Sequence, residues 1–249
     1  MPRFADPTAF DRDPPNQMML DRRWWSSRIA PESRRKDLRD IVQLATSLLA
    51  RRLAGRNVTA DVEASVQLQL AMILQGLGQL YEFEPADCFV VQLEGVVPLT
   101  QAAPKAGTGN PRVDILLGLG AGQHFATCAL ELKYLKRDNV RQPLNRYDVY
   151  CDLANLEKYR ERHVDETYLY VVTNDPAYRN KVPTGAAADF DLSQGVTVSG
   201  NTPLTYRGRK ATRAPIALQR DYTFEWQELR VWGRAVESLH MLVVHGSRG

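Results

Sequence analysis

The sequence of 249 residues predicts an α/β fold in which a mixed β-sheet is flanked by helices. Segments with helical periodicity alternate along the chain with segments rich in β-branched and aromatic residues. Their order is helix, three strands, helix and strand, preceded by one further helix. The second helix of this series is a crossover, and the right-handed rule for crossovers restricts where the last strand can lie.

Two helices are expected before the sheet. Apolar residues recur at helical spacing from Glu32 to Ala54, and Gly55 ends the pattern. A second helix is expected after Thr59, whose side-chain oxygen suits it to the N-cap position. The apolar stripe of this helix runs from Val62 to Leu77.

The strands are expected from composition and from the turn residues between them. The first three are Cys88–Leu99, Arg112–Leu119 and His124–Leu135. Glycines within residues 118–122 permit a tight reversal between the last two strands. A helix at Asp148–Arg162 and a covered strand at Thr167–Thr173 complete the alternation.

The length of the chain predicts one domain with elaborations. We divide it into an N-terminal arm and helix (residues 1–58), a core (59–179) and an extension of loops and β-structure that completes the same domain (180–249). The arm is irregular, with Trp24 and Trp25 as a docking point. Strand candidates in the extension are residues 222–232 and 239–244.

Composition excludes several classes of protein. The formal net charge of +3 does not by itself require a nucleic-acid partner. Three scattered cysteines and four dispersed histidines argue against a disulfide framework, an iron–sulfur cluster and a zinc hydrolase. No apolar run approaches the ~18 residues of a membrane span, and the N-terminus lacks the apolar stretch of a signal peptide. We therefore expect a cytoplasmic protein.

Three charged residues of the central hairpin are the strongest candidates for a site: Asp114, Glu131 and Lys133. A reversal near Gly120 would place Asp114 opposite residues 126–129, a short step from Glu131. Glu131 and Lys133 share one face of their strand because side chains alternate with a period of two. Alternating Glu and Lys can also mark a solvated sheet edge. Here, however, the acidic residues lie in otherwise apolar strands, where unpaired charge is costly.

The chemistry of these residues suits a magnesium ion. Mg²⁺ prefers carboxylate, carbonyl and water oxygens, so Asp114 and Glu131 would bind it and the Leu132 carbonyl could add a third ligand. The metal would polarise a phosphate and lower the pKa of a bound water. Lys133 would orient that water and stabilise charge on the phosphorus.

Asp114 and the Glu131-x-Lys133 motif, together with the order of elements, resemble the PD-(D/E)XK nuclease superfamily. The resemblance covers about residues 61–173, under half of the chain, with Pro111 at a slightly wide spacing before Asp114. The segments LEKYRERHVDETYLYVVTNDPAYR and YTFEWQEL are also similar to parts of restriction-endonuclease-like families.

The resemblance implies a restriction-endonuclease-like core, in residues 59–179, with the order α-β-β-β-α-β. It implies an endonuclease that hydrolyses DNA with Mg²⁺, or with Mn²⁺ as a substitute, in restriction or another defence against foreign DNA. Because cleavage of both strands normally requires two active sites, we expect a homodimer.

Further acidic residues have candidate supporting roles. Members of the superfamily often carry an acidic residue on the first core helix, and Glu63 is the candidate for such a metal ligand, although it could merely favour the helix dipole. Glu94 is a weaker alternative. On the crossover helix Asp152 shares a face with Leu156 and Tyr159. Asp152 has two possible roles. It would orient Lys133 or a water without binding the metal itself, or it would pair with a neighbouring arginine.

Basic residues in two regions are candidate nucleic-acid contacts. One group directly follows Lys133 and could bind phosphates near the site: Lys136, Arg137, Arg141 and Arg146. The other group consists of Arg207, Arg209 and Lys210. These residues lie in the loop at residues 201–215, which is the preferred recognition element. Taken singly, either group is more typical of a solvated surface than of a DNA contact.

Three other functions remain open at this point. The chain could be a non-catalytic nucleic-acid-binding module with the same fold, although the intact trio of Asp114, Glu131 and Lys133 argues against a decayed site. It could be a nuclease that acts on RNA through the same residues. It could also be an α/β interaction protein.

Overall fold

A computed structural model describes most of the chain. The described residues are 31–58, 62–97, 112–121, 124–137, 141–162, 164–208, 213–229 and 239–247. The expected arm with Trp24 and Trp25 lies outside them. No helix in the described part is both long and apolar enough to cross a membrane.

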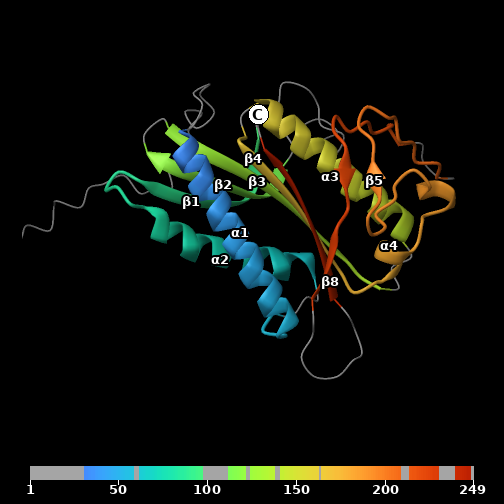
Figure 1. The fold of residues 1–249 in the computed structure, drawn as a ribbon, viewed down its shortest axis with the longest axis horizontal. Helices are drawn as coiled ribbons and strands as arrows, with labels where there is room; N and C mark the ends of the chain where they lie inside the picture. The colour runs from blue at the N-terminus through green and yellow to red at the C-terminus, as the bar shows by residue number, and fades with distance from the viewer. Residues whose placement is uncertain are drawn as a thin grey trace, which may run out of the picture.

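The helices and strands follow the predicted order (Figure 1). The helices are α1 (Glu32–Ala54), α2 (Glu63–Gly78), α3 (Gln142–Arg162) and α4 (Ala177–Asn180), with 3-10 turns at Gln79–Tyr81 and Gly185–Ala187. The strands of the main sheet are β1 (Cys88–Val96), β2 (Arg112–Ala121), β3 (His124–Leu135), β4 (Glu166–Thr173), β7 (Trp226–Leu229) and β8 (Leu239–Ser247). A small separate pair consists of β5 (Thr197–Val198) and β6 (Tyr222–Thr223).

The main sheet is mixed, which confirms the predicted α/β class. Its strand order is β1-β2-β3-β4-β8-β7. Only β3 and β4 pair in parallel, because α3 carries the chain back across the sheet between them; the other neighbours are antiparallel. The extension contributes β7 and β8 to this same sheet, so both parts share one set of backbone hydrogen bonds.

Two hydrophobic cores lie on the two faces of the sheet. Alternate residues of β4 divide between them: Tyr170 and Val172 pack with α1 and α2, whereas Leu169 and Val171 pack with α3. Every residue of β4 is buried. A strand covered on both faces is rich in β-branched and aromatic residues for this reason, as the segment TYLYVVT is.

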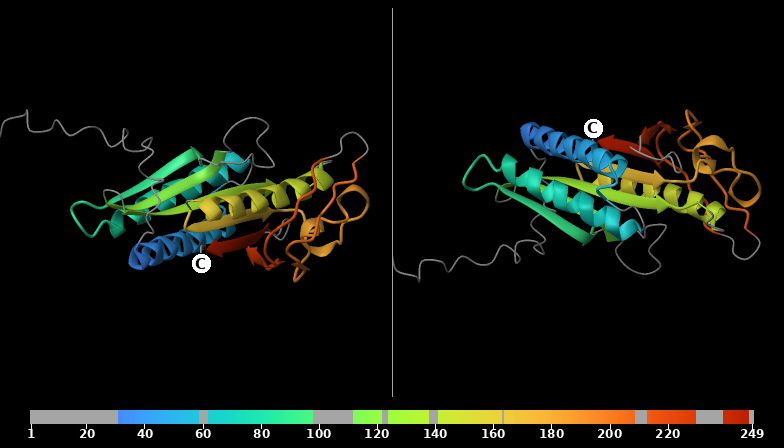
Figure 2. Two further views of the ribbon diagram at one scale, coloured as in Figure 1. Left: turned by 90° about the horizontal axis from the view of Figure 1, so that it is seen from above. Right: turned by 90° about the horizontal axis from the view of Figure 1, so that it is seen from below.

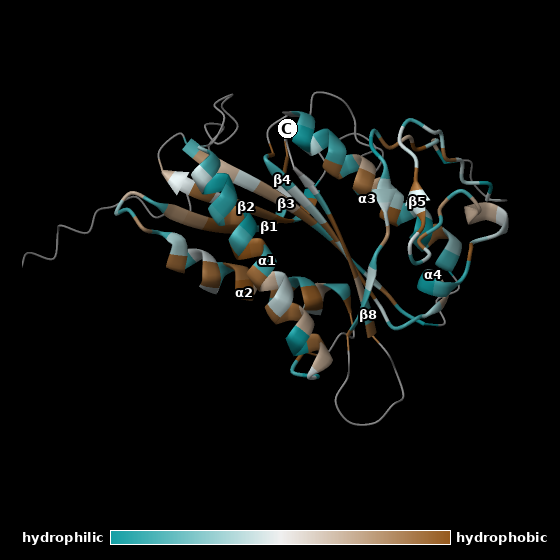
Figure 3. Ribbon diagram, in the orientation of Figure 1, coloured by the Kyte–Doolittle hydropathy of each residue, from teal (hydrophilic) through white to brown (hydrophobic). Residues whose placement is uncertain are grey.

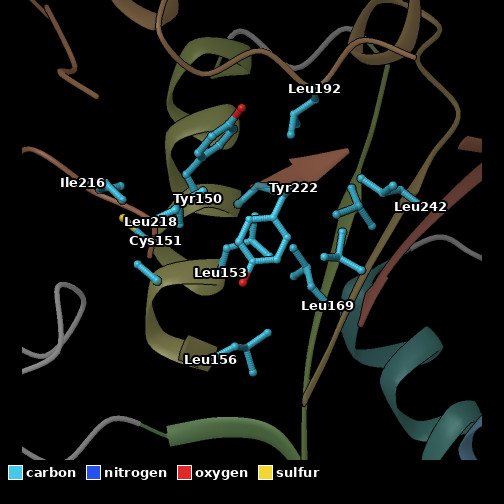
Figure 4. Close-up of a cluster of buried hydrophobic side chains, with 14 of the residues drawn as sticks. Tyr150, Cys151, Leu153, Leu156, Leu169, Leu192, Ile216, Leu218, Tyr222 and Leu242 are labelled. Carbon is cyan, nitrogen blue, oxygen red and sulfur yellow. The ribbon is translucent and has the colours of Figure 1, made fainter. Parts of the chain in front are cut away.

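The extension packs against the outer side of α3. Figure 4 shows Tyr150, Leu153 and Leu156 of α3 among side chains of the extension and of β4 and β8. Glu157, which is 2% exposed, fixes this contact because its carboxylate accepts bonds from the backbone N–H groups of Gln219 and Arg220 and from the Tyr222 hydroxyl. These bonds attach residues 219–222 of the extension to α3.

Two helix boundaries differ from the prediction. The N-cap of α2 is Val62 and not Thr59, which lies outside the described residues. Helix α3 begins at Gln142, earlier than the predicted Asp148. Pro143 at the start of the helix is compatible with this because the first turn needs no backbone N–H donor there. Tyr147 lies in the added turns and is buried in the core, and this burial stabilises the longer helix.

Two glycines of α2 provide a test of this packing. A Cβ atom on Gly78 would collide with the buried ring of Phe89, whereas a Cβ on the exposed Gly76 would meet nothing within 4 Å. We expect Gly78→Ala to lower the free energy of unfolding by about 1–3 kcal/mol through overpacking. Gly76→Ala should raise it by about 0.5–1 kcal/mol because alanine favours the helix. Chemical denaturation of both variants would measure this, and equal effects of the two substitutions would contradict it.

Candidate active site

The candidate residues lie where β2 and β3 approach the start of α2 and one side of α3. Asp114 is on β2, and Glu131 and Lys133 are on β3. Glu63 is the first residue of α2, and Asp152 is on α3. Four separate elements therefore contribute charged side chains to one region.

The register of the hairpin corrects the predicted position of Asp114. Strands β2 and β3 pair from Ala121↔His124 to Ile115↔Leu130. Asp114 is therefore one step beyond the last pair, next to Glu131 and not opposite residues 126–129. The prediction was wrong because Gly120 pairs with Phe125 inside the ladder, so the reversal comes after Ala121.

Asp114 leaves the regular hydrogen-bonding pattern of the sheet. One carboxylate oxygen accepts a bond from the Leu132 N–H at 2.6 Å, and its main-chain carbonyl accepts one from Gln67 on α2 at 2.7 Å. The ladder with β1 pairs the residues on either side of it but not Asp114 itself. On β1 the residue at this position is Glu94, which has a φ of 52° and is exposed. This left-handed backbone is costly for a residue other than glycine and marks a local distortion beside Asp114.

The Lys133 ammonium lies between carboxylates from two helices. Its Nζ atom is 3.3 Å from Oε1 of Glu63 and 3.4 Å from Oδ2 of Asp152, and it donates to the Leu132 carbonyl at 3.1 Å. Burial by itself would lower the pKa of Lys133. The negative charges of Asp152, Glu63, Asp114 and Glu131 outweigh it and raise that pKa. Lys133 therefore stays charged at neutral pH.

Glu63 and Asp152, which both contact Lys133, belong to helices that pack on opposite faces of the sheet. The second oxygen of Glu63 accepts a bond from the Tyr134 N–H at 3.0 Å, so Glu63 is fixed to β3 by two contacts. Asp152 is fully buried. Of the two roles expected for Asp152, its distance from Nζ favours the one in which it orients Lys133.

The electrostatics of Asp114 reflect a surplus of negative charge. Burial raises its pKa, and the charges of Asp152 and Glu63 add to this effect. Lys133 and the bond from Leu132 oppose it, without cancelling it. The charge of Glu131, which is 2% exposed, also acts on both Lys133 and the buried Tyr159. Four carboxylates thus surround a single ammonium, an arrangement that favours an additional cation.

The donor chemistry is that of a site for a hard cation. The carboxylates of Asp114 and Glu131 and the carbonyl of Leu132 are oxygen ligands of the kind that Mg²⁺ prefers. Within the described residues, no three His, Cys, Asp or Glu side chains are already grouped closely enough to hold a metal ion. The residues suit the ion in ligand type and charge, but not in their present grouping.

Two polar residues near the candidate residues were not predicted from the sequence. Gln67 binds the Asp114 carbonyl, and its position one helical turn after Glu63 could have indicated that both face the hairpin. Asn155 lies one turn after Asp152 on α3 and is 1% exposed, with no hydrogen-bond partner for its Oδ1 among the described residues. Burial of this kind is not visible in a sequence.

The basic residues after β3 divide into exposed and buried ones. Lys136 and Arg137 are exposed at the end of β3, and Arg141 is exposed immediately before α3. The ammonium of Lys136 lies 5.9 Å from the ring centre of Tyr134. Arg146 is instead 3% exposed and donates to the carbonyls of Ala177 and Lys181, so its expected role as a surface contact is wrong.

The predicted recognition loop is only partly described. Arg207 is exposed, and its guanidinium forms an ion pair of 2.7 Å with Asp189. A bond from the Thr205 N–H and, after it, the contact with Arg207 lower the pKa of Asp189. Arg209 and Lys210 lie outside the described residues.

Comparisons of the chain with protein-family models, with curated proteins and with solved structures gave no match.

Removal of the Lys133 charge should destabilise the fold. In Lys133→Met the carboxylates of Asp152 and Asp114 lose their cation, and we expect the free energy of unfolding at neutral pH to fall by about 1–3 kcal/mol. The loss should shrink as the pH falls, because protonation of the carboxylates removes the uncompensated charge. Denaturation curves at neutral and acidic pH would measure both effects. Lys36→Met is the matched control, since Lys36 pairs with Asp40 on the exposed side of α1. Equal effects of the two substitutions would contradict the prediction.

Proposed function

We propose that this protein is a metal-dependent endonuclease that hydrolyses phosphodiester bonds of DNA, in restriction or another defence against foreign DNA. The observation that carries the proposal is the position of Lys133. Its ammonium lies beside Asp114 and Glu131 and is held by Glu63 and Asp152 from two helices. A cation fixed next to two carboxylates is the arrangement that phosphoryl transfer requires of a protein.

The order of the elements supports the same proposal. Helix α2, strands β1, β2 and β3, helix α3 and strand β4 follow one another as in the restriction-endonuclease-like core that the sequence resembles. The candidate residues fall on β2 and β3 of this series, where the resemblance assigns them. The supporting acidic residue is the first residue of α2.

The chemistry follows from the residues of this chain. A bound Mg²⁺ ion would polarise the phosphate and lower the pKa of a water. Asp114, Glu131 and the Leu132 carbonyl would hold the ion. Lys133 would orient the attacking water and stabilise the charge that develops on the phosphate oxygens. Glu63 and Asp152 keep Lys133 charged and in position, and Gln67 and the Leu132 N–H orient Asp114.

The proposal predicts loss of cleavage in two variants. Asp114→Asn and Lys133→Met should each reduce Mg²⁺-dependent cleavage of plasmid DNA by at least about 10²–10³-fold, because each removes a preorganised group. Asp40→Asn and Lys36→Met carry the same changes in an exposed ion pair on α1 and should cleave like the unaltered protein. Circular dichroism would show that all four variants are folded.

Three results would decide against this proposal. Undiminished Mg²⁺-dependent cleavage by both site variants would place the activity elsewhere. Cleavage of RNA but not of DNA, in separate incubations with Mg²⁺ or Mn²⁺ and with a chelator as control, would replace DNA by RNA as the substrate. Nucleic-acid binding without cleavage of either would indicate a non-catalytic module.

The exposed basic residues after β3 should contact phosphates. We expect the double variant Lys136→Ala, Arg137→Ala to bind DNA more weakly, with a salt dependence reduced by about one unit of slope for each lost phosphate contact. The loss should be similar for all sequences, because phosphate contacts carry no base information. Fluorescence anisotropy at several salt concentrations would measure it, with Lys36→Ala as the control. An unchanged slope would exclude these residues from the interface.

A further inference from the structure

A pocket of about 430 Å³ lies between the last turns of α1 and the strands β7 and β8. Three buried residues give it an apolar floor: Ala50, Leu229 and Met241. Three exposed residues give it a polar rim: Ser47, Arg51 and Gln227. Figure 3 shows a similar mixture in the last turns of α1, where a hydrophilic segment lies between hydrophobic ones. The volume is within the range of roughly 300–1,000 Å³ that is usual for small-ligand sites, so the pocket suits one small unit such as a nucleotide.

The charge of the pocket favours an anion. The charged side chain of its rim is that of Arg51, which makes no ion pair with another described residue. Glu228 also lines the pocket, but its side chain is on the other face of β7, because side chains of a strand alternate. Its cross-strand partner on that face is His240, whose ring bonds to Arg179 of α4. The carboxylate of Glu228 therefore does not oppose the guanidinium of Arg51.

The register of the sheet relates the pocket to the candidate active site. Tyr134 follows Lys133 and pairs with Val172. Val172 pairs in turn with Met241, and Met241 pairs with Gln227. These residues form one row across β3, β4, β8 and β7, and neighbouring strands are about 4.8 Å apart, so Gln227 is about 14 Å from Tyr134. In Figure 1 the end of α1 and the start of β8 lie together at the lower side of the molecule.

A nucleic acid at the candidate site would bring phosphates to this end of the sheet. The exposed Lys136 and Arg137 follow β3 at the same end. Successive nucleotides of a duplex strand are about 3.4 Å apart along its axis, so the pocket is about four nucleotides from Lys133. A guanidinium binds phosphate through parallel hydrogen bonds, and an amide side chain with apolar neighbours can hold a base. The rim and the floor of the pocket contain these groups.

We propose that the pocket between α1 and β7 binds one nucleotide of the DNA substrate, about four positions from the bond that is cut. Arg51 binds the phosphate of this nucleotide, Gln227 bonds to the edge of its base, and the apolar floor covers the base. The inference rests on the proposed nuclease function, since the candidate active site determines where the DNA lies.

Two adjacent arginines of α1 provide the test. Arg51 lines the pocket, whereas Arg52 is equally exposed and points in another direction, because successive residues of a helix are about 100° apart. Fluorescence anisotropy would measure binding of a labelled DNA duplex at several salt concentrations without metal. We expect Arg51→Gln to weaken binding about three- to tenfold and to lower the salt slope by about one. Arg52→Gln should bind within about twofold of the unaltered protein, with the same slope.

Gln227→Ala provides a second variant of the same pocket. It should weaken DNA binding and leave the salt slope unchanged, because the lost contact is to a base and not to a phosphate. Gln79→Ala is its control, since Gln79 is exposed in the 3-10 turn after α2. All four substituted positions are exposed, and circular dichroism would show that the variants are folded.

The outcomes separate this inference from the proposed function. If the unaltered protein binds and cleaves DNA but Arg51→Gln binds it like Arg52→Gln, the inference is wrong and the proposed function stands. If the unaltered protein neither binds nor cleaves DNA, both are wrong. A free deoxynucleoside monophosphate is the third probe. Binding of it that Arg51→Gln abolishes, with DNA binding unchanged, would mean that the pocket takes a free nucleotide and would overturn the inference.

Discussion

Lys133 is the residue through which the two faces of the sheet are connected. Its ammonium contacts Glu63 at the start of α2 on one side and the buried Asp152 of α3 on the other. A buried cation requires such partners, and buried carboxylates require the cation in return. The positions of α2 and α3 relative to β3 are therefore coupled to one charge. The main-chain bonds of Leu132 and Tyr134 to Asp114 and Glu63 extend this coupling to β2.

The charge balance around Lys133 is unfavourable for stability and would favour an additional cation. Four carboxylates act on one ammonium, and burial already raises the pKa of Asp114. A core built for stability alone would avoid this surplus. Elsewhere the chain neutralises its buried acids more completely. Glu157 accepts bonds from three donor groups of the extension, and Glu166 lies between Arg39 and His245. The contrast makes the region around Asp114 the exception among the buried charges described.

The two edges of the main sheet are treated differently. At one edge the extension supplies β8 and β7, and Trp226 of β7 bonds through its indole to the Leu192 carbonyl. At the other edge β1 pairs with β2 on its inner side, and in the described part of the chain no strand pairs with its outer side. Figure 2 shows β1 at the end of the molecule away from the extension. The extension thus completes one side of the sheet, and within the described residues the opposite edge stays open.

Local patterns determined much of this protein from the sequence alone. The apolar repeat predicted both ends of α1, and the composition of β3 predicted its bounds, His124–Leu135. Both predictions were possible because periodicity and turn residues are properties of the chain itself. The alternation in β3 also placed Glu131 and Lys133 on one face. Only the tertiary structure decided the register that brings Asp114 next to Glu131, since it depends on where the hairpin reverses. The burial of Arg146, the contact of Gln67 with Asp114 and the choice of Lys133 as the partner of Asp152 also required the packed structure, because residues distant in sequence make these contacts.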